Sequence, residues 1–201
     1  MSLLPDATSP DPEEGVEPVE ERVVLMDAEA VRLALARMAR EVVERAEGTE
    51  GLVLLGIRRR GVELAERLRE FIQEGEGVRV PFGILDITLY RDDLQEIGLR
   101  PVVGESELPL EGVEGRTVVL VDDVLYTGRT VRAALNELMD WGRPARILLC
   151  VLVDREGREL PIQADIIGRS VGVLPRQRVE VLVPEEDGRL AVEVATRGGP
   201  A

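Results

Sequence analysis

The sequence V-V-L-V-D-D-V-L-Y-T-G-R-T, from Val118 to Thr130, places two adjacent aspartates directly after an apolar run. Two neighbouring carboxylates repel each other, so a ligand must make the arrangement useful. The apolar run predicts a buried strand, and the turn from Thr127 predicts the start of a helix. Ligands of parallel sheets bind beyond the carboxyl ends of the strands. Asp122 and Asp123 are therefore candidate ligand-binding residues.

The turn after the aspartates has the composition of a phosphate-binding site. Free N–H groups at a helix N-terminus attract anions, and Gly128 lets the backbone approach a ligand closely. Thr127 and Thr130 add hydroxyl donors. A ligand that carries a phosphate at one end and vicinal hydroxyls at the other would satisfy the whole element, and ribose 5-phosphate has that shape.

Two other interpretations of this stretch were weighed. The first is purely structural, an acidic loop followed by a helix cap. The second is a phosphoacceptor receiver domain, which also gathers acids at strand ends but needs a later lysine. The chain contains no lysine, which argues against the receiver domain.

The composition excludes several kinds of catalytic site. With no histidine, the chain cannot form Ser-His or Cys-His nucleophilic sites or a histidine-ligated metal centre. With no lysine, it has neither a Schiff base nor the lysine of a Walker A loop. The one cysteine, Cys150, lies inside an apolar run and is expected to be a core residue.

The charge distribution divides the chain into a tail and a domain. The net charge is −14, and residues 1–21 hold seven acids, four prolines and no base. Such a segment cannot bury enough apolar surface to order itself, so residues 1–21 are predicted to be a disordered acidic tail and 22–201 one domain. There is no apolar run of roughly 18 residues, which argues against a membrane span, and a cytoplasmic location is expected by default.

The hydrophobic pattern predicts an α/β fold. Strands are expected at 23–26, 52–55, 117–121 and 147–153, with helices at 28–42, 62–72 and 130–141. Strands that are apolar throughout and alternate with helices indicate a parallel sheet with helices on both faces. Residues 91–115 form a long connection that is predicted to be a flexible loop, and residues 154–197 are predicted to form a small β-rich hood.

Four motifs together resemble one family. Val118–Thr130 resembles the phosphoribosyl-pyrophosphate (PRPP) signature of type I phosphoribosyltransferases. With G-I-R-R-R-G at 56–61, D-I-T-L-Y-R-D-D at 86–93 and V-D-R-E-G-R-E-L-P-I-Q-A-D-I-I-G at 153–168, the chain is similar to the bifunctional pyrimidine operon attenuators and uracil phosphoribosyltransferases. The resemblance runs from about Val23 to Val194.

The resemblance implies both an enzyme and a regulator. The enzyme would have the type I phosphoribosyltransferase fold and would convert uracil and PRPP, with Mg²⁺, into UMP and pyrophosphate. With UMP bound, the same protein would bind pyrimidine-operon leader mRNA and promote transcription termination. A homo-oligomer, a dimer or larger, is also implied.

The resemblance also assigns residues to substrates. Asp122 and Asp123 would hold the ribose hydroxyls near Mg²⁺, and Arg91, at the start of the flexible loop, would act with them in catalysis. The residues implied for PRPP and UMP binding are Arg59, Arg60, Arg91, Asp122, Asp123, Val124, Leu125, Tyr126, Thr127, Gly128, Arg129, Thr130, Arg155 and Val179.

Tyr126 bears on the choice of base. Related purine enzymes carry an acid immediately before Thr-Gly, where it can take a proton from the five-membered ring of the purine. Uracil has no such ring, so a tyrosine at this position fits a pyrimidine. The backbone of Val179, rather than its side chain, would pair with the edge of the base.

Arginines on one surface are expected to bind RNA. The resemblance assigns this role to Arg37, Arg40, Arg45, Arg158 and Arg169. Gly157 and Gln163 stand where relatives often carry histidine and arginine, and fewer charges predict weaker, less salt-dependent binding. Two alternatives stay open: a phosphoribosyltransferase with no RNA-binding role, and an RNA-binding regulator whose catalysis is vestigial.

Overall fold

The computed structural model describes residues 21–90 and 104–196. Its elements are β1 (Glu21–Met26), α1 (Ala28–Arg45), β2 (Leu52–Ile57), α2 (Arg60–Glu76), β3 (Phe82–Leu85), a 3₁₀ turn η1 (Ile87–Tyr90), β4 (Thr117–Leu125), α3 (Arg129–Trp141), β5 (Arg146–Arg155), β6 (Ile166–Val171), β7 (Gln177–Leu182), α4 (Pro184–Asp187) and β8 (Ala191–Thr196).

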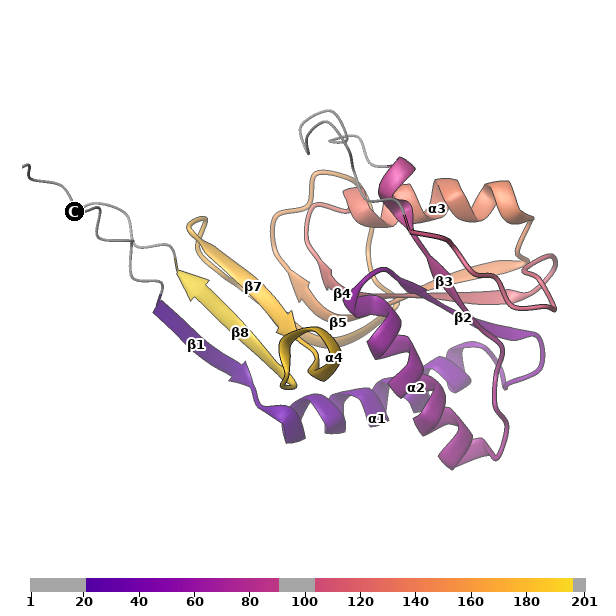
Figure 1. Cartoon of the computed structure of the whole chain (residues 1–201), viewed down its shortest axis with the longest axis horizontal. Helices are drawn as coiled ribbons and strands as arrows, with labels where there is room; N and C mark the ends of the chain where they lie inside the picture. Colours follow the sequence, from indigo (N-terminus) through magenta and orange to yellow (C-terminus); the bar gives the residue numbers. More distant parts are fainter. Residues whose placement is uncertain (1–20, 91–103, 197–201) are drawn as a thin grey trace, which may run out of the picture.

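A five-stranded parallel sheet, in the order β3-β2-β4-β5-β6, forms the body of the molecule. Helices α1 and α2 cover one face and α3 covers the other (Figure 1). Alternate residues of β4 divide between the two cores: Val119 and Val121 pack toward α1 and α2, whereas Val118 and Leu120 pack toward α3. This is the period-two pattern of a strand that is buried on both faces, and it confirms the predicted α/β architecture.

Local sequence signals explain where the helices begin and end. The Asp27 carboxylate accepts a 2.8 Å hydrogen bond from the Ala30 N–H and caps α1, as its position before the apolar spacing predicts. Helix α2 ends at Gly77, which has a left-handed conformation (φ 71°) that glycine adopts without steric cost. Cys150 is fully buried in β5, as expected, and burial raises the pKa of its thiol.

The strands that build the hood differ from the predicted range 154–197 in two respects. The hood is a separate antiparallel sheet in the order β1-β8-β7, so it includes Glu21–Met26 from the beginning of the described chain. Strand β6, which was predicted to belong to the hood, instead pairs in parallel with β5 at the edge of the main sheet. Sequence spacing could not reveal this, because β1 and β8 pair across almost the whole chain. Figure 1 shows the hood at the left of the main sheet.

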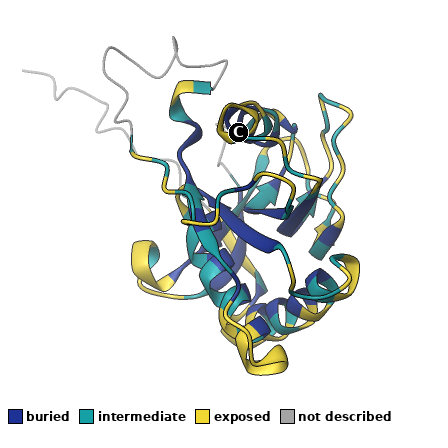
Figure 2. Cartoon of the chain, turned by 90° about the vertical axis from the view of Figure 1, so that its right-hand side faces the viewer, coloured by how far each residue is buried: buried dark blue, intermediate teal, exposed yellow. Residues whose placement is uncertain are grey.

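Figure 2 shows buried residues at the centre of the molecule and exposed residues on the helices and loops around it. All residues of β2 and most of those of β4 and β5 are buried. Of the predicted loop 91–115, Arg91 and the residues up to 103 lie outside the described part of the chain. The remainder is anchored, because Glu107 forms a bridge with Ile84 of β3. The predicted tail lies outside the described part, apart from Glu21, which begins β1. No helix in the described ranges has the length and apolar character that crossing a membrane requires.

Candidate active site

A cleft of about 510 Å³ opens at the carboxyl edge of the parallel sheet. Its walls come from the end of β4, the start of α2, the segment after β3 and the first turn of α3. The lining residues are Arg58, Arg59, Arg60, Asp86, Ile87, Thr88, Gly104, Asp122, Asp123, Val124 and Thr130. The cleft therefore brings together three of the four motifs, 56–61, 86–93 and 118–130, which are far apart in the sequence.

The two aspartates lie together at the end of β4. Strand β4 continues through both of them, with Asp122 opposite Val151 and Val124 opposite Val153. Their carboxyl groups interact with each other, and the positive charge of Arg60 acts on Asp123. Both aspartates line the cleft.

Burial disfavours the ionised form of both carboxyl groups. Only 6% of Asp122 is exposed, and loss of solvent, followed by the charge of Asp123, raises its pKa well above the usual value. Burial also raises the pKa of Asp123, although the Val124 N–H and the Arg60 charge oppose this. A ligand that supplies hydroxyl donors, or a cation, would relieve this unfavourable state.

The two glycines of G-I-R-R-R-G allow α2 to approach the sheet. A methyl group on Gly61 would lie 2.5 Å from the Val121 carbonyl oxygen, and one on Gly56 would lie 2.5 Å from the Val62 Cα. Both close contacts involve backbone atoms, which side-chain rotation cannot relieve. The glycines thus bring Arg59 and Arg60 to the cleft beside the aspartates.

Gly61→Ala should therefore weaken PRPP binding and lower the melting temperature. The added methyl must move α2 away from β4, and such overpacking costs about 1–3 kcal/mol. Calorimetry with PRPP and a thermal unfolding curve would measure both effects. Gly75→Ala is the matched control, because a methyl there meets nothing within 4 Å. Equal behaviour of the two variants would contradict the close-approach argument.

Asp86 is a site residue that the sequence analysis quoted within a motif but assigned no role. Its carboxylate accepts hydrogen bonds from the Thr88 N–H (2.9 Å) and the Gly104 N–H (2.7 Å). The Arg58 guanidinium lies 3.8 Å away, and 8% of Asp86 is exposed. These donors hold the pKa of Asp86 below its usual value against the effect of burial. The Asp86 carboxylate therefore joins two segments of the cleft wall, the turn at Thr88 and the chain at Gly104, by hydrogen bonds.

The turn before α3 has the form that the sequence predicts. Gly128 has a φ of 93° and is the N-cap of α3, which begins at Arg129, and the Thr127 hydroxyl accepts a hydrogen bond from the Arg129 N–H at 3.4 Å. Thr130 lines the cleft, whereas the Arg129 guanidinium turns aside to pair with Glu159 at 2.7 Å. Leu125 is a buried core residue, so only its backbone could contact a ligand.

A second depression, of about 440 Å³, lies between the end of β4 and the hood. It is lined by Tyr126, Arg155, Pro175, Arg176, Gln177 and Arg178. The Arg155 guanidinium stacks on the Tyr126 ring, 3.8 Å from its centroid, and donates to the Gln177 carbonyl at 3.4 Å. Tyr126 and Arg155 therefore lie together beyond the end of β4.

Val179 belongs to β7, which is an edge strand of the hood sheet. In antiparallel sheets the backbone groups of alternate residues point to the same side of the strand. The Gln177 carbonyl points away from β8, toward Arg155. The Val179 N–H and carbonyl share that direction and face away from the β8 ladder.

The comparisons with known proteins agree with this geometry. Residues 25–173 match the family described as "Phosphoribosyl transferase domain". The chain is 57% identical over 175 residues to the bifunctional protein PyrR of Thermus thermophilus, covering 87% of this chain and 96% of that protein. For PyrR of Deinococcus radiodurans the identity is 49% over 173 residues, covering 86% and 94%.

The chain belongs to the bifunctional PyrR family. Its structure is also similar to a hypoxanthine-guanine phosphoribosyltransferase from Bacillus anthracis, with a TM-score of 0.66 at 17% identity, covering 87% of this chain and 98% of that one. A hypoxanthine phosphoribosyltransferase from Trypanosoma cruzi gives 0.65 at 21%, covering 92% and 95%. These structural neighbours confirm the type I phosphoribosyltransferase fold that was expected for a PyrR-family chain.

Three of the five arginines expected to bind RNA lie together in this PyrR-family structure. Arg37, Arg40 and Arg45 of α1 line a surface depression of about 660 Å³. The sequence analysis missed a fourth arginine there, Arg146, whose guanidinium donates to the Arg45 carbonyl at 2.8 Å. Only tertiary structure could add it, because Arg146 begins β5, 101 residues away. We call Arg37, Arg40, Arg45 and Arg146 the α1 arginine surface.

The other two arginines differ from each other in their surroundings. Arg169 of β6 donates to the Leu25 carbonyl at 2.6 Å, and the neighbouring Gly168 carbonyl accepts from Arg37, so Arg169 lies close to the α1 arginine surface. Arg158 pairs with Asp154 and donates to several backbone carbonyls, including those of Leu125 and Tyr126. Arg158 therefore supports the end of β4 in this structure.

The two aspartates are the residues of the cleft that fit a magnesium ion bound together with substrate. Within 21–90 and 104–196, no group of three or more acidic or cysteine side chains could hold a metal ion alone. Mg²⁺ is commonly bound by one or two carboxylates together with phosphate oxygens of the substrate. Asp122 and Asp123 fit that pattern.

Proposed function

We propose that this protein transfers the phosphoribosyl group of PRPP to uracil, giving UMP and pyrophosphate, and that its UMP-bound form binds pyrimidine-operon leader mRNA to attenuate transcription. The observation that carries the enzymatic half is the cleft itself. Two desolvated carboxylates, the Thr127–Thr130 turn and the arginines of α2 meet at the carboxyl edge of one parallel sheet. The printed name of the relatives, bifunctional protein PyrR, supports both halves.

Each part of the cleft has a role in the transfer. Asp122 and Asp123 accept hydrogen bonds from the ribose hydroxyls, and the turn around Gly128 holds the 5′-phosphate with its N–H groups. Arg59 and Arg60 stabilise the leaving pyrophosphate. The bond from C1′ to the pyrophosphate oxygen breaks, a bond from C1′ to uracil N1 forms, and N1 loses its proton. Mg²⁺, when bound with PRPP, neutralises charge that develops on the pyrophosphate.

The base would lie in the depression beside Tyr126. Arg155 lines this space and can donate to the edge of a pyrimidine. Val179 follows the lining residue Arg178 in β7, and its outward-facing backbone can both donate and accept. Arg91, the third residue expected to act in catalysis, lies outside the described residues. Its role, the oligomeric state and the cytoplasmic location remain predictions.

Uracil should be used and hypoxanthine and guanine should not. The residue before Thr127 is Tyr126, so no acid is placed there to take a proton from a purine ring. Sites built on specific hydrogen bonds commonly discriminate by a factor of about 10⁴ or more. Turnover measured with each base at equal PRPP tests this, and a purine rate comparable to the uracil rate would overturn the assignment.

The enzyme-only alternative has one observation in its favour. Several arginines expected to meet RNA already bind within the protein: Arg37 donates to the Ile167 and Gly168 carbonyls, and Arg45 pairs with Glu41. Binding RNA would require exchanging some of these contacts. A gel shift with a pyrimidine-leader hairpin, with and without UMP, together with a uracil and PRPP assay, separates the alternatives.

A further inference from the structure

Helix α2 and the hood are joined by a row of ion pairs. The short helix α4 carries the sequence P-E-E-D, and its three acids face three arginines of α2 and of the residue before it. Arg67 pairs with Glu185 at 3.0 Å, Arg59 with Glu186 at 3.8 Å and Arg60 with Asp187 at 3.0 Å. These contacts connect the wall of the cleft to an element more than 100 residues later in the chain.

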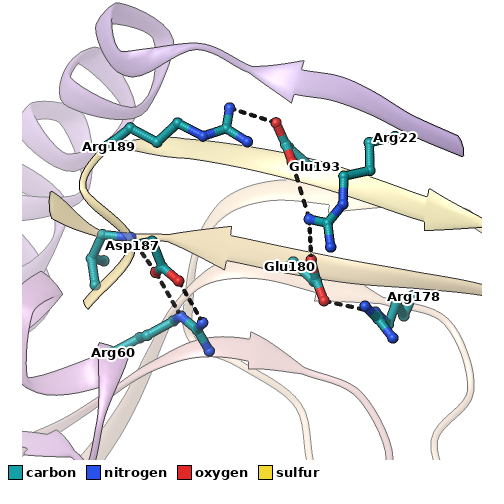
Figure 3. Close-up of polar contacts among 8 residues, drawn as sticks. Arg22, Arg60, Arg178, Glu180, Asp187, Arg189 and Glu193 are labelled. Atoms are coloured by element: carbon teal, nitrogen blue, oxygen red, sulfur yellow. Dashed lines mark hydrogen bonds and ion pairs between the residues drawn. The ribbon is translucent and has the colours of Figure 1, made fainter. Parts of the chain in front are cut away.

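The Arg60–Asp187 pair differs from the other two in its geometry. Arg60 donates from Nε to one Asp187 oxygen at 3.2 Å and from Nη2 to the other at 3.0 Å. Such paired hydrogen bonds fix the plane of a guanidinium as well as its position. Figure 3 shows Arg60 of α2 and Asp187 of the hood pointing toward each other.

Asp187 is itself held in place. One of its oxygens accepts from the Val183 N–H at 2.9 Å, and its own N–H donates to the Val183 carbonyl at 2.7 Å. Gly188 follows in a left-handed conformation (φ 71°) and closes the turn. The hydrogen bond from Arg60 lowers the pKa of Asp187, so its carboxylate stays charged at neutral pH. The carboxylate that Arg60 meets is therefore a fixed feature of the hood.

Arg60 also belongs to the cleft. It lines the same wall as Asp122 and Asp123, and its charge acts on Asp123. Arg67 does not line the cleft, although it comes from the same helix and meets the same acidic turn. Asp187 thus forms an ion pair with a residue that lines the cleft, whereas Glu185 forms an ion pair with a residue outside the cleft.

We propose that Asp187 is a positioning residue for pyrophosphate and PRPP: through its two-oxygen contact it sets the Arg60 guanidinium against the cleft. The inference rests on the proposed function, because it assigns Arg60 to the leaving group. It also connects the hood, which would read the base, to the pyrophosphate side of the site. Asp187, which is more than 100 residues from Arg60 in the sequence, thereby contributes to the binding of pyrophosphate and PRPP.

The test is Asp187→Asn, which keeps the shape of the side chain and removes its charge. Binding of Mg-pyrophosphate and of PRPP, measured by calorimetry, should weaken about tenfold, the lower end of what loss of a supporting contact costs an ordered site. In the uracil assay the KM for PRPP should rise by a similar factor, with kcat changing less. Asp187→Glu, which retains the carboxylate, should recover most of the affinity.

Glu185→Gln is the matched control. It breaks a hood-to-α2 ion pair of the same length but leaves every cleft residue untouched, so it should bind Mg-pyrophosphate as the parent does. Both variants should show similar, small decreases in melting temperature. If Glu185→Gln weakens pyrophosphate binding as much as Asp187→Asn, the acidic turn only docks the hood, and the positioning role is wrong.

A variant that lacks the Arg60 guanidinium tests whether Asp187 acts through Arg60. In an Arg60→Gln protein, adding Asp187→Asn should cause no further loss of pyrophosphate affinity, because the group that Asp187 positions is gone. A further loss of the same size, or tighter binding in the single Asp187→Asn variant, would overturn the proposal. A parent that binds Mg-pyrophosphate but does not turn over uracil would contradict the proposed function alone, since the calorimetry still measures the pair.

Discussion

Asp122→Asn combined with Asp123→Asn should abolish PRPP binding and leave the protein folded. Each aspartate is expected to accept hydrogen bonds from a ribose hydroxyl, and the pair places negative charge at the end of β4 where it could meet Mg²⁺. Hydrogen bonds to charged groups contribute about 1.5–3 kcal/mol each. Since about 1.4 kcal/mol is a factor of ten, losing two should weaken binding roughly 100-fold or more.

The same variant should not lose stability at neutral pH. A carboxyl whose folded pKa is raised stabilises the fold below its unfolded pKa, and that contribution is lost as pH rises through the folded value. Both aspartates have raised pKa values, so at neutral pH they cost stability, and neutral asparagines remove that cost. The melting temperature should equal or exceed that of the parent at neutral pH and converge with it in acid.

Calorimetry with PRPP and thermal unfolding across pH measure both effects. The matched control is Glu70→Gln with Glu74→Gln, which removes two negative charges from the exposed side of α2. It should bind PRPP as the parent does. Unchanged PRPP affinity in the aspartate variant would contradict the ribose assignment, and an unfolded variant would show that the aspartates are structural.

Arg37→Gln combined with Arg40→Gln should sharply weaken RNA binding and leave uracil transfer intact. The two side chains lie on the α1 arginine surface, which extends from Arg146 at the start of β5 to the Ile167 carbonyl of β6 and shares no residue with the cleft. Strand β5 runs from Arg146 on that surface to Arg155 beside Tyr126. Its ten residues span roughly 30 Å at about 3.3 Å per residue. Substitutions at one end of the strand should not reach the chemistry at the other.

The expected size follows from phosphate contacts. Arginine pairs with phosphates and stacks on unpaired bases, so losing two should reduce affinity roughly 10- to 100-fold. The slope of log affinity against log salt should become less steep by about 1.4, the value for two contacts to single-stranded RNA. UMP should strengthen binding of the parent by about 1–3 kcal/mol, and RNA should strengthen UMP binding by the same factor.

Gel shifts at several salt concentrations, alongside the transferase assay, provide the test. Arg32→Gln is the matched control, because Arg32 lies on a different side of α1 and pairs only locally with Glu29 at 2.7 Å. If the double variant binds a pyrimidine-leader hairpin as tightly as the parent, the surface is wrongly placed. If it loses uracil transfer together with RNA binding, the two functions do not use separate surfaces. A thermal unfolding curve checks that losing the hydrogen bond from Arg37 to the Ile167 carbonyl has not destabilised α1.

Much of the fold and of the cleft could be read from short stretches of sequence. Strand β4, the turn at Gly128 and helix α3 are contiguous, so apolar periodicity and a turn signal predict them together. The cap at Asp27 and the glycines of G-I-R-R-R-G are also local. The sequence also predicts Asp122 and Asp123 together at a strand end, and both line the cleft, although β4 extends four residues beyond its predicted end at Val121.

The sequence by itself determined the parallel sheet, the phosphate-binding turn and the family, because each depends on residues that are close together in the chain. Tertiary structure alone decided which strands build the hood, that Asp187 meets Arg60, and that Arg146 joins Arg37 and Arg40. Those facts depend on pairings between residues up to 175 positions apart, such as Glu21 with Thr196. Local periodicity carries no information about such pairings, since they are fixed only when two buried faces and their charges are packed against each other.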